Sequence, residues 1–349
     1  MLEEFRARIL ERRPLRIRGG GSKDFYGRAL AGELLDTRAH RGIVDYEPTE
    51  LVVTARCGTP LAELQATLAE RGQMLGFEPP AFGGEATLGG VVAAGLSGPR
   101  RASAGAVRDF VLGVQLMDGE GRLLRFGGRV MKNVAGYDVA RLQAGSLGTL
   151  GLITEVSLKV LPRPAEELTL RFELPQPAAL ARLHGWAARP LPLSGSCWHS
   201  GVLLLRLSGA RAAVQGAAAG LGGERVAEGE AAVFWEQLRE QRHAFFDAAG
   251  GPLWRLSVPA TTPALALPAP TLIEWGGALR WVRGEADARA AAVAAGGHAT
   301  RFRSGDGDPR RADGVFQPLD PVVLRIHRDL KRAFDPHGVF NPGRLYAEL

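Results

Sequence analysis

Three glycine-rich segments hold the residues whose types and spacing could bind a ligand. They are Gly19-Gly20-Gly21-Ser22, the stretch from Gly83 to Gly98, and residues 145–154. Without side chains the backbone can approach a phosphate closely, and successive N–H groups form a nest for an anion. A single glycine triplet favours a plain turn. Three such loops, with few candidate catalytic side chains among them, indicate one long bound cofactor rather than a compact active site.

The second segment predicts a helix that begins near Thr87 and carries small residues on one face. These are Gly89, Gly90, Ala93, Ala94, Gly95 and Ser97. Such a face could lie against a large planar ligand, with the N-terminal dipole of the helix available to an anion. Tight packing against another element is the alternative. No stretch of the chain has the spacing of a Walker loop or of a G-x-G-x-x-G turn.

The elements that must position these loops follow from hydrophobic periodicity and turn residues. In the N-terminal part we expect helices over residues 2–12 and 61–71. Thr59 and Pro60 would occupy the cap and first turn of the second helix, and Gly72 its end. The expected strands are residues 15–18, two short strands within 42–55, and then 111–118, 123–126 and 152–160. The first of these strands runs straight into Gly19.

The segment from residue 166 to about 314 alternates strands with alanine-rich helices. The expected strands are residues 168–174, 202–207, 254–258, 271–275 and 279–282, and the helices include 212–221 and 286–295. This alternation predicts an α+β unit with an antiparallel sheet. The chain then continues into an expected helix over residues 322–334 and an extended tail.

Composition and charge exclude several classes of protein. The net charge is +6, but the basic residues are interleaved with acidic ones and no nucleic-acid-binding motif accompanies them, so we expect no nucleic-acid partner. No segment approaches the roughly 18 apolar residues of a membrane span, and acidic residues stand where a signal peptide would be basic, which predicts a cytoplasmic protein. Cys57 and Cys197 have no Cys or His at metal-ligand spacing, so neither a disulfide framework nor a metal site is expected.

Several motifs carry a family resemblance. Arg18-Gly-Gly-Gly-Ser, Pro79-Pro-Ala-Phe-Gly-Gly-Glu-Ala-Thr-Leu-Gly-Gly and the stretch from Arg100 to Gly113 resemble the FAD domain of the vanillyl-alcohol oxidase family, also called the PCMH type. Lys132-Asn-Val-Ala-Gly-Tyr-Asp and Gly145-Ser-Leu-Gly-Thr-Leu-Gly narrow the resemblance to the glycolate oxidase and D-lactate dehydrogenase branch. Phe334-Asp-Pro-His-Gly-Val-Phe-Asn-Pro-Gly-Arg is similar to the C-terminal signature of that branch.

The resemblance implies an α+β fold with three parts. Residues 1–163 would form a PCMH-type FAD-binding domain of two α+β subdomains, about 1–56 and 57–163. Residues 164–315 would form a short α+β cap domain with an antiparallel sheet and helices. Residues 316–349 would be a C-terminal helix and tail that return to pack on the FAD domain.

The resemblance also implies a set of FAD-binding residues. Gly19, Gly20, Gly21 and Ser22, preceded by Arg18, would cradle the diphosphate. Residues along the ribityl chain and the isoalloxazine ring would be Thr87, Leu88, Gly89, Gly90, Gly95, Ser97 and Gly98. Arg108 and Asp109 belong to the next motif, and the residues bordering the adenine end or the diphosphate would be Gly148, Leu150, Gly151 and Ile153. For two of these a structural role is the alternative, since Asp109 could brace a turn and Ile153 could be core.

Two departures from the family pattern bear on chemistry. Ser22 stands where relatives with covalent flavin often carry histidine, so we expect non-covalent FAD. The histidine-rich motif of the catalytic subunits, G-H-x-G-D-G-N-x-H, is absent, and no two of the seven histidines are closer than ten residues. The remaining catalytic candidates are Lys132, Tyr137 and His298. Asn133 and Asp138 accompany the first two in a polar group, with capping and turn roles as the alternative.

The resemblance implies a subunit of an FAD-dependent oxidoreductase. It would work with a catalytic flavoprotein partner and an iron–sulfur partner to oxidise glycolate, or D-lactate, to the 2-oxo acid, and the complex could associate peripherally with a membrane. This chain would support catalysis or relay electrons. The alternatives are a self-sufficient D-2-hydroxy-acid dehydrogenase and a structural subunit with a vestigial flavin site. We also expect that valine at Gly20 or Gly90 impairs flavin binding before it impairs folding.

Overall fold

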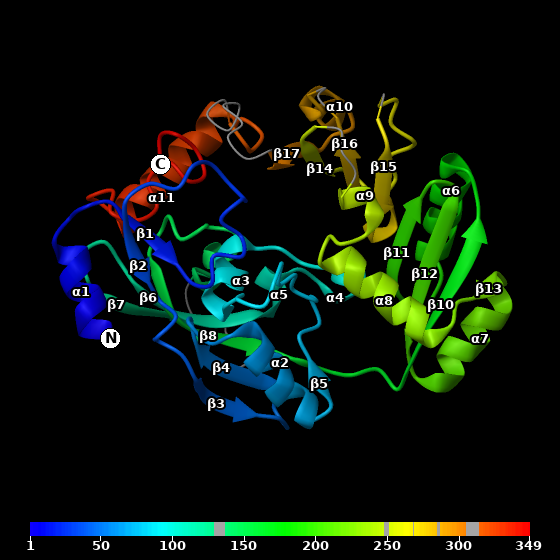
Figure 1. Ribbon diagram of the computed structural model, residues 1–349, viewed down its shortest axis with the longest axis horizontal. Coiled ribbons are helices and arrows are strands. Elements are labelled where there is room, and N and C mark those ends of the chain that lie inside the picture. The colour runs from blue at the N-terminus through cyan, green and yellow to red at the C-terminus, as the bar shows by residue number, and fades with distance from the viewer. Residues whose placement is uncertain (129–136, 248–250, 268, 285–286, 305–313) are drawn as a thin grey trace. The chain divides into compact units, whose positions relative to one another are not determined.

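The computed structural model describes residues 1–128, 137–247, 251–267, 269–284, 287–304 and 314–349. The chain divides into two compact units (Figure 1). Unit 1 comprises residues 1–97, 106–162 and 309–349, and unit 2 comprises residues 98–105 and 163–308. The domain limits expected near residues 56, 163 and 315 stay predictions.

The main sheet of unit 1 has five antiparallel strands in the order β3-β4-β8-β6-β7. Their bounds are β3 (Ile43–Glu47), β4 (Val52–Arg56), β6 (Val111–Met117), β7 (Leu123–Gly127) and β8 (Leu152–Lys159). Strand β8 is central and reads Leu-Ile-Thr-Glu-Val-Ser-Leu-Lys, a run rich in the branched residues that favour a pleated, buried surface. Since Arg56 pairs with Glu155, strands from both sides of residue 56 share one sheet.

Two smaller pairings complete the strands of unit 1. β1 (Leu15–Arg18) pairs in parallel with β2 (Glu33–Asp36), and β5 (Gln73–Met74) pairs antiparallel with β9 (Leu161–Pro162). Leu15 also forms a parallel bridge with Phe340. A buried cluster joins Phe5 and Ile9 to Leu15, Val339 and Phe340, so that both ends of the chain share one core beside β1 (Figure 1).

The helices of unit 1 are α1 (Leu2–Leu10), α2 (Leu61–Glu70), α3 (Leu88–Ala94), α5 (Val107–Phe110), the 3-10 helix η1 (Ala140–Gln143) and α11 (Pro321–Phe334). Four of them, α1, α2, α3 and α11, lie close to the predicted positions, whereas α5 and η1 were not predicted. Helix α2 begins at Leu61 as expected, but the expected capping residue was wrong by one position. Pro60 is its N-cap, and Thr59 Oγ1 instead accepts a hydrogen bond from Gly42 N at 2.9 Å.

Unit 2 is built on an eight-stranded sheet in the order β13-β10-β12-β11-β15-β16-β14-β17, with every pairing antiparallel. Its strands are β10 (Glu166–Glu173), β11 (Leu193–His199), β12 (Val202–Gly209), β13 (Glu224–Arg225), β14 (Leu253–Ser257), β15 (Thr271–Glu274), β16 (Leu279–Arg283) and β17 (His298–Arg303). The antiparallel α+β prediction is therefore confirmed for this part of the chain.

The helices of unit 2 are α4 (Arg101–Ala104), α6 (Gln176–Ala187), α7 (Arg211–Leu221), α8 (Glu228–Arg239), α9 (Ala244–Asp247), η2 (Trp275–Gly277) and α10 (Arg289–Ala294). Of these, the sequence predicted α7 and α10 but not α4, α6, α8, α9 and η2. Helices α6 and α7 pack on strands β10 and β12 through a core that includes Leu183, Trp186 and Val214 (Figure 1). Strands β11, β13 and β17 were also missed, as were the short strands β2, β5 and β9 of unit 1.

Candidate functional site

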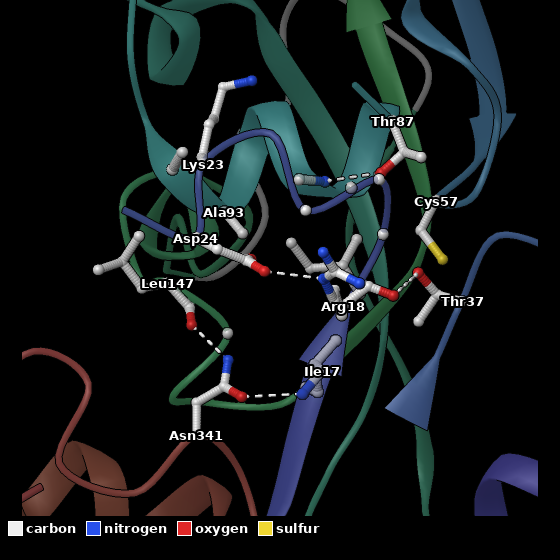
Figure 2. Close-up of a pocket in the computed structure, with 18 of the residues that line it drawn as sticks. Ile17, Arg18, Lys23, Asp24, Thr37, Cys57, Thr87, Ala93, Leu147 and Asn341 are labelled. Carbon is white, nitrogen blue, oxygen red and sulfur yellow. Dashed lines mark hydrogen bonds and ion pairs between the residues drawn. The ribbon is translucent and has the colours of Figure 1, made fainter. Parts of the chain in front are cut away.

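A pocket in unit 1 collects residues from all three glycine-rich segments and from the C-terminal tail (Figure 2). The space between its walls, including open solvent, is about 770 Å³. The residues that line it are Ile17, Arg18, Gly19, Gly20, Gly21, Ser22, Lys23, Asp24, Leu30, Thr37, Cys57, Thr87, Gly89, Gly90, Ala93, Ala94, Leu147, Gly148, Gly151, Leu152, Ile153, Asn341 and Arg344.

The first loop lies flat on the segment that precedes α3. A Cβ atom at Gly19 would collide with Thr87 Oγ1, and one at Gly20 would collide with the carbonyl oxygen of Glu85. Gly21 has a φ of +73°, which favours glycine. Within the described part of the chain, the N–H groups of Gly20, Gly21 and Ser22 have no hydrogen-bond partner. These consecutive free donors suit the oxygen atoms of a phosphate.

Helix α3 has a different role from the one expected for its N-terminus. Leu88 N donates to Thr59 O at 2.9 Å, Gly89 N to Cys57 O at 2.8 Å and Gly90 N to Thr87 Oγ1 at 3.4 Å. The first-turn donors are thus satisfied within the chain, which favours the packing alternative over an anion at this terminus. What α3 contributes to the pocket is its face of small residues.

The room for an added Cβ atom on that face of α3 differs from one glycine to the next. A Cβ atom at Gly89 would lie 2.7 Å from Cys57 Cβ, so this glycine is required by packing. At Gly90 the added atom would meet only Thr87 Oγ1, at 3.3 Å. Together with Ala93 and Ala94, Gly90 leaves a smooth pocket wall that a flat ligand can approach.

The third segment supplies another part of the wall. Gly148, with a φ of +70°, Gly151 and Ile153 line the pocket, as do Leu147 and Leu152. Gly95, the C-cap of α3, packs against Gly145, with its missing Cβ only 2.7 Å from Gly145 Cα. Close packing of the second and third segments therefore depends on this pair.

Charged side chains stand beside the free N–H groups. Arg18 Nε donates to Asp24 Oδ2 at 2.8 Å, and both side chains line the pocket with Lys23 and Arg344 (Figure 2). Three cations and one carboxylate give this part of the wall a net positive charge. Such a wall attracts an anionic ligand.

The pocket brings together eleven of the residues predicted from the sequence. They are Arg18, Gly19, Gly20, Gly21, Ser22, Thr87, Gly89, Gly90, Gly148, Gly151 and Ile153. Seven others do not line it, namely Leu88, Gly95, Ser97, Gly98, Arg108, Asp109 and Leu150.

Local contacts explain several of the seven. Leu88 is buried at 1% exposure in the core. Ser97 Oγ accepts from Val107 N at 3.0 Å, and an Asp109 carboxylate oxygen accepts from Ala106 N at 2.8 Å, so Asp109 does brace a turn. Leu150 lines a different cavity of unit 1, beside α11.

The catalytic candidates are not gathered in this pocket. Lys132 and Asn133 lie outside the described residues. Tyr137 is 95% exposed, and Asp138 pairs with Arg141 at 3.0 Å. His298 begins β17 in unit 2, where partial burial and the charge of Arg255 lower its pKa.

Unit 2 does bring together two histidines that are far apart in sequence. The rings of His199 and His243 lie 5.6 Å apart and nearly perpendicular. His199 Nδ1 lies 3.3 Å from Thr271 O, and His243 Nδ1 accepts from Phe245 N at 3.2 Å. The rings thus belong to an aromatic cluster. In the part of the chain that the structure describes, no group of three or more metal-ligating side chains occurs.

Sequence reasoning missed ten of the lining residues: Ile17, Lys23, Asp24, Leu30, Thr37, Cys57, Leu147, Leu152, Asn341 and Arg344. Asn341 and Arg344 stand in a recognised C-terminal motif, which was the available signal for them. Cys57 is fully buried, and this burial raises the pKa of its thiol to about 12. It therefore remains protonated at neutral pH.

Two family models match the chain. Residues 7–127 match the FAD binding domain, and residues 310–345 match the C-terminal domain of FAD linked oxidases. Of the pocket residues, those from the first two glycine segments lie within the first match, and Asn341 and Arg344 lie within the second. No helix among the described residues is long and apolar enough to cross a membrane.

Curated proteins include a full-length relative. The chain is 51% identical over 352 residues to the glycolate oxidase subunit GlcE of Escherichia coli. This alignment covers 100% of this chain and 97% of that protein. It is 32% identical over 128 residues to the glycolate oxidase subunit GlcD of Bacillus subtilis, covering 37% of this chain and 27% of that protein. It is 30% identical over 167 residues to the D-lactate dehydrogenase of Archaeoglobus fulgidus, covering 46% of this chain and 36% of that protein.

A solved structure shares the fold. Alkyldihydroxyacetonephosphate synthase aligns with a TM-score of 0.67 over 99% of this chain and 75% of its own, at 15% identity. At that identity the likeness concerns the fold alone. With the first family match, it confirms the predicted α+β fold of the PCMH-type FAD-binding family.

Proposed function

The chain belongs to the family of the glycolate oxidase subunit GlcE, and from that premise we propose that it is the FAD-binding subunit of a complex that oxidises glycolate. FAD is its cofactor. When bound, FAD accepts electrons from a 2-hydroxy acid or from another carrier and passes them on. The chain itself binds and orients that cofactor.

The observation that carries this proposal is the pocket of unit 1. The free N–H groups of Gly20, Gly21 and Ser22, next to the Arg18 guanidinium, would hold the negatively charged diphosphate. The smooth wall of Gly90, Ala93 and Ala94 would lie against an apolar, flat part of the cofactor. Of the predicted FAD contacts, we retain in the proposed site the eleven that line this pocket.

A relay or supporting role is favoured by the side chains of that pocket. No histidine is among its lining residues, and its thiol, Cys57, is protonated. The carboxylate of Asp24 also lines the pocket, but it accepts a hydrogen bond from Arg18 Nε at 2.8 Å. None of these groups is therefore our candidate for the base that accepts a proton from a substrate hydroxyl. We propose that the main substrate site is on a catalytic flavoprotein partner and that an iron–sulfur partner receives the electrons. The cytoplasmic location, with peripheral membrane association through the complex, stays a prediction.

The test is anaerobic reduction of the flavin. The isolated chain, purified with FAD, is mixed with glycolate or D-lactate, and its visible flavin absorbance is followed; the same experiment is then done with the co-expressed catalytic and iron–sulfur subunits. A relay predicts no bleaching in the isolated chain and rapid bleaching in the complex. Bleaching of the isolated chain would establish a self-sufficient dehydrogenase. A colourless chain that cannot be reconstituted with FAD would establish a vestigial site.

A further inference from the structure

The C-terminal tail of unit 1 reaches two of the glycine-rich loops through one side chain, Asn341. Its Nδ2 donates to Leu147 O at 2.6 Å, and its Oδ1 accepts from Ile17 N at 2.8 Å (Figure 2). Ile17 lies in the strand that enters the first loop, and Leu147 precedes Gly148 of the third. A single amide, only 7% exposed, therefore joins two segments of the pocket wall.

Arg344 fixes the chain that follows the first loop. Its guanidinium donates to Asp24 O at 2.9 Å and also to the carbonyl oxygens of Tyr26 and Arg28. Arg28 N returns a hydrogen bond to Arg344 O at 3.0 Å. The residue is 4% exposed and lines the pocket. Its planar fork can bind several carbonyl oxygens at once, which an ammonium group cannot do with the same geometry.

The tail that carries these two side chains is itself firmly anchored. Leu15 N donates to Val339 O at 2.7 Å, and Asn341 N donates to Leu15 O at 2.9 Å. Lys331 Nζ donates to Phe340 O and Thr149 O, both at 2.8 Å. The tail is therefore a rigid support for the loops rather than a loose end that lies on them.

We infer that Asn341 and Arg344 are positioning residues of the cofactor site, because they hold the first and third glycine loops in the arrangement that FAD requires. The inference rests on the proposed FAD pocket. Free N–H groups on a loop bind a diphosphate tightly only if the loop already holds that arrangement. If a smaller fraction of the free protein has its loops in the arrangement that binds FAD, the apparent Kd for FAD rises by the same factor.

The test uses two variants of the full chain and one control. Asn341→Gly removes the bridging amide while keeping a residue that accepts the local φ of +40°. Arg344→Lys keeps the charge but loses the fork. Gln73→Ala is the matched control. Gln73 is also 7% exposed, and it likewise makes two long-range hydrogen bonds, with Tyr46 Oη and Pro48 O, both at 2.8 Å. It does not line the pocket.

Three quantities are measured: the Kd for FAD by fluorescence titration of flavin-free protein, its unfolding midpoint, and its amide hydrogen exchange. For Asn341→Gly and Arg344→Lys we expect a Kd raised about tenfold, as a competent fraction of one-tenth requires. Peptides covering residues 19–28 and 145–150 should exchange faster than in the parent chain. Gln73→Ala should lower the unfolding midpoint similarly but leave the Kd and both loops unchanged.

Several results would overturn the inference. One is an unchanged Kd with unchanged loop exchange in both variants; another is an equal rise in Kd for Gln73→Ala. If Asn341→Gly does not fold, Arg344→Lys decides by the same criteria. If the parent chain binds no FAD, the loop exchange alone decides. Failure of glycolate oxidation in the complex leaves this result intact, because the probe is FAD binding to the isolated chain.

Discussion

A Cβ atom at Gly20 would overlap with the backbone carbonyl oxygen of Glu85. The glycine of the first loop is thus required by contact with the chain that precedes α3, whatever binds on the opposite side. The expectation that substitution of Gly20 impairs flavin binding before folding is therefore at odds with the structure. Gly90 still meets that expectation, because it lines the pocket and a Cβ atom there would meet only Thr87 Oγ1, at 3.3 Å.

Gly90→Ala should separate binding from folding. Alanine favours a helix over glycine by up to about 1 kcal/mol, so the flavin-free protein should unfold at an equal or higher temperature. The added methyl group narrows the pocket wall, and an overpacking penalty of about 1.4 kcal/mol raises the Kd for FAD about tenfold. Fluorescence titration and thermal unfolding of the same sample provide both measurements. Tenfold weaker binding together with a lower midpoint would contradict the prediction.

Gly20→Ala should show the opposite pattern. The methyl group forces apart two backbone segments, which destabilises unit 1 by about 1–3 kcal/mol. We expect a lowered unfolding midpoint in the flavin-free protein itself. An unchanged midpoint with weakened FAD binding would show that the loop has room to move away from Glu85.

Lys331→Met should strongly destabilise unit 1. Lys331 is 7% exposed and pairs with Asp335, which is 2% exposed, at 2.7 Å. Burial lowers the pKa of this lysine, and Asp335 opposes that shift. Removing the ammonium leaves an unpaired buried carboxylate, for which a loss of about 3 kcal/mol is typical.

The control for Lys331 lies one residue along the same helix. Arg332 pairs with Asp329 at 2.7 Å, but the side chains are 73% and 59% exposed. Arg332→Met should change stability by less than about 1 kcal/mol. Chemical denaturation of the two variants tests the difference, and equal losses would argue against a special role of burial.

The stability of unit 2 should fall in mild acid. Burial and the neighbouring His199 lower the pKa of His243 below its ordinary value of 6.5, and Asp247 opposes this. The unfolded chain then binds more protons than the folded one as pH falls below about 6.5, so protonation favours unfolding. His243→Phe keeps an aromatic ring against Phe234 and removes this titration. Its unfolding midpoint should depend less on pH between 7.5 and 5 than that of the parent, and equal slopes would contradict the assignment.

Flavin release by acid tests the mode of attachment. Ser22 lines the pocket where related proteins with covalent flavin often carry histidine, and the Cys57 thiol is held protonated by burial. We therefore expect that acid precipitation leaves all the yellow flavin in the supernatant. Flavin that remains with the pellet after washing would show a covalent bond.

Local patterns predicted most elements, and tertiary contacts explain those that were missed. The strand at residues 15–18 and the glycine loop after it were visible as an alternation followed by glycines. Strand β17 has the sequence His-Ala-Thr-Arg-Phe-Arg, in which four of the six side chains are polar, and it was not predicted. In the structure Arg301 is only 9% exposed, and its guanidinium carbon lies 5.1 Å from the ring centre of Trp254. No local pattern indicates that an arginine will be buried by an aromatic ring.

Dependence on contacts between distant segments also limited the prediction of the pocket residues. Loops whose own backbone forms the wall were found from their glycines. Asn341 and Arg344 were not, because their partners lie more than 190 positions away in the sequence. The sequence also did not show whether the N–H groups in the first turn of α3 have hydrogen-bond partners. Two of their acceptors are carbonyl groups of a separate segment, those of Cys57 and Thr59.

The bridge between Leu15 and Phe340 also has a consequence for synthesis of the chain. A ribosome adds about 5–20 residues per second, so Leu15 emerges on the order of tens of seconds before Phe340 exists. During that time the first glycine loop lacks the tail that supports it. We therefore expect FAD to bind only after residues 339–344 have been synthesised and have paired with the N-terminal strand.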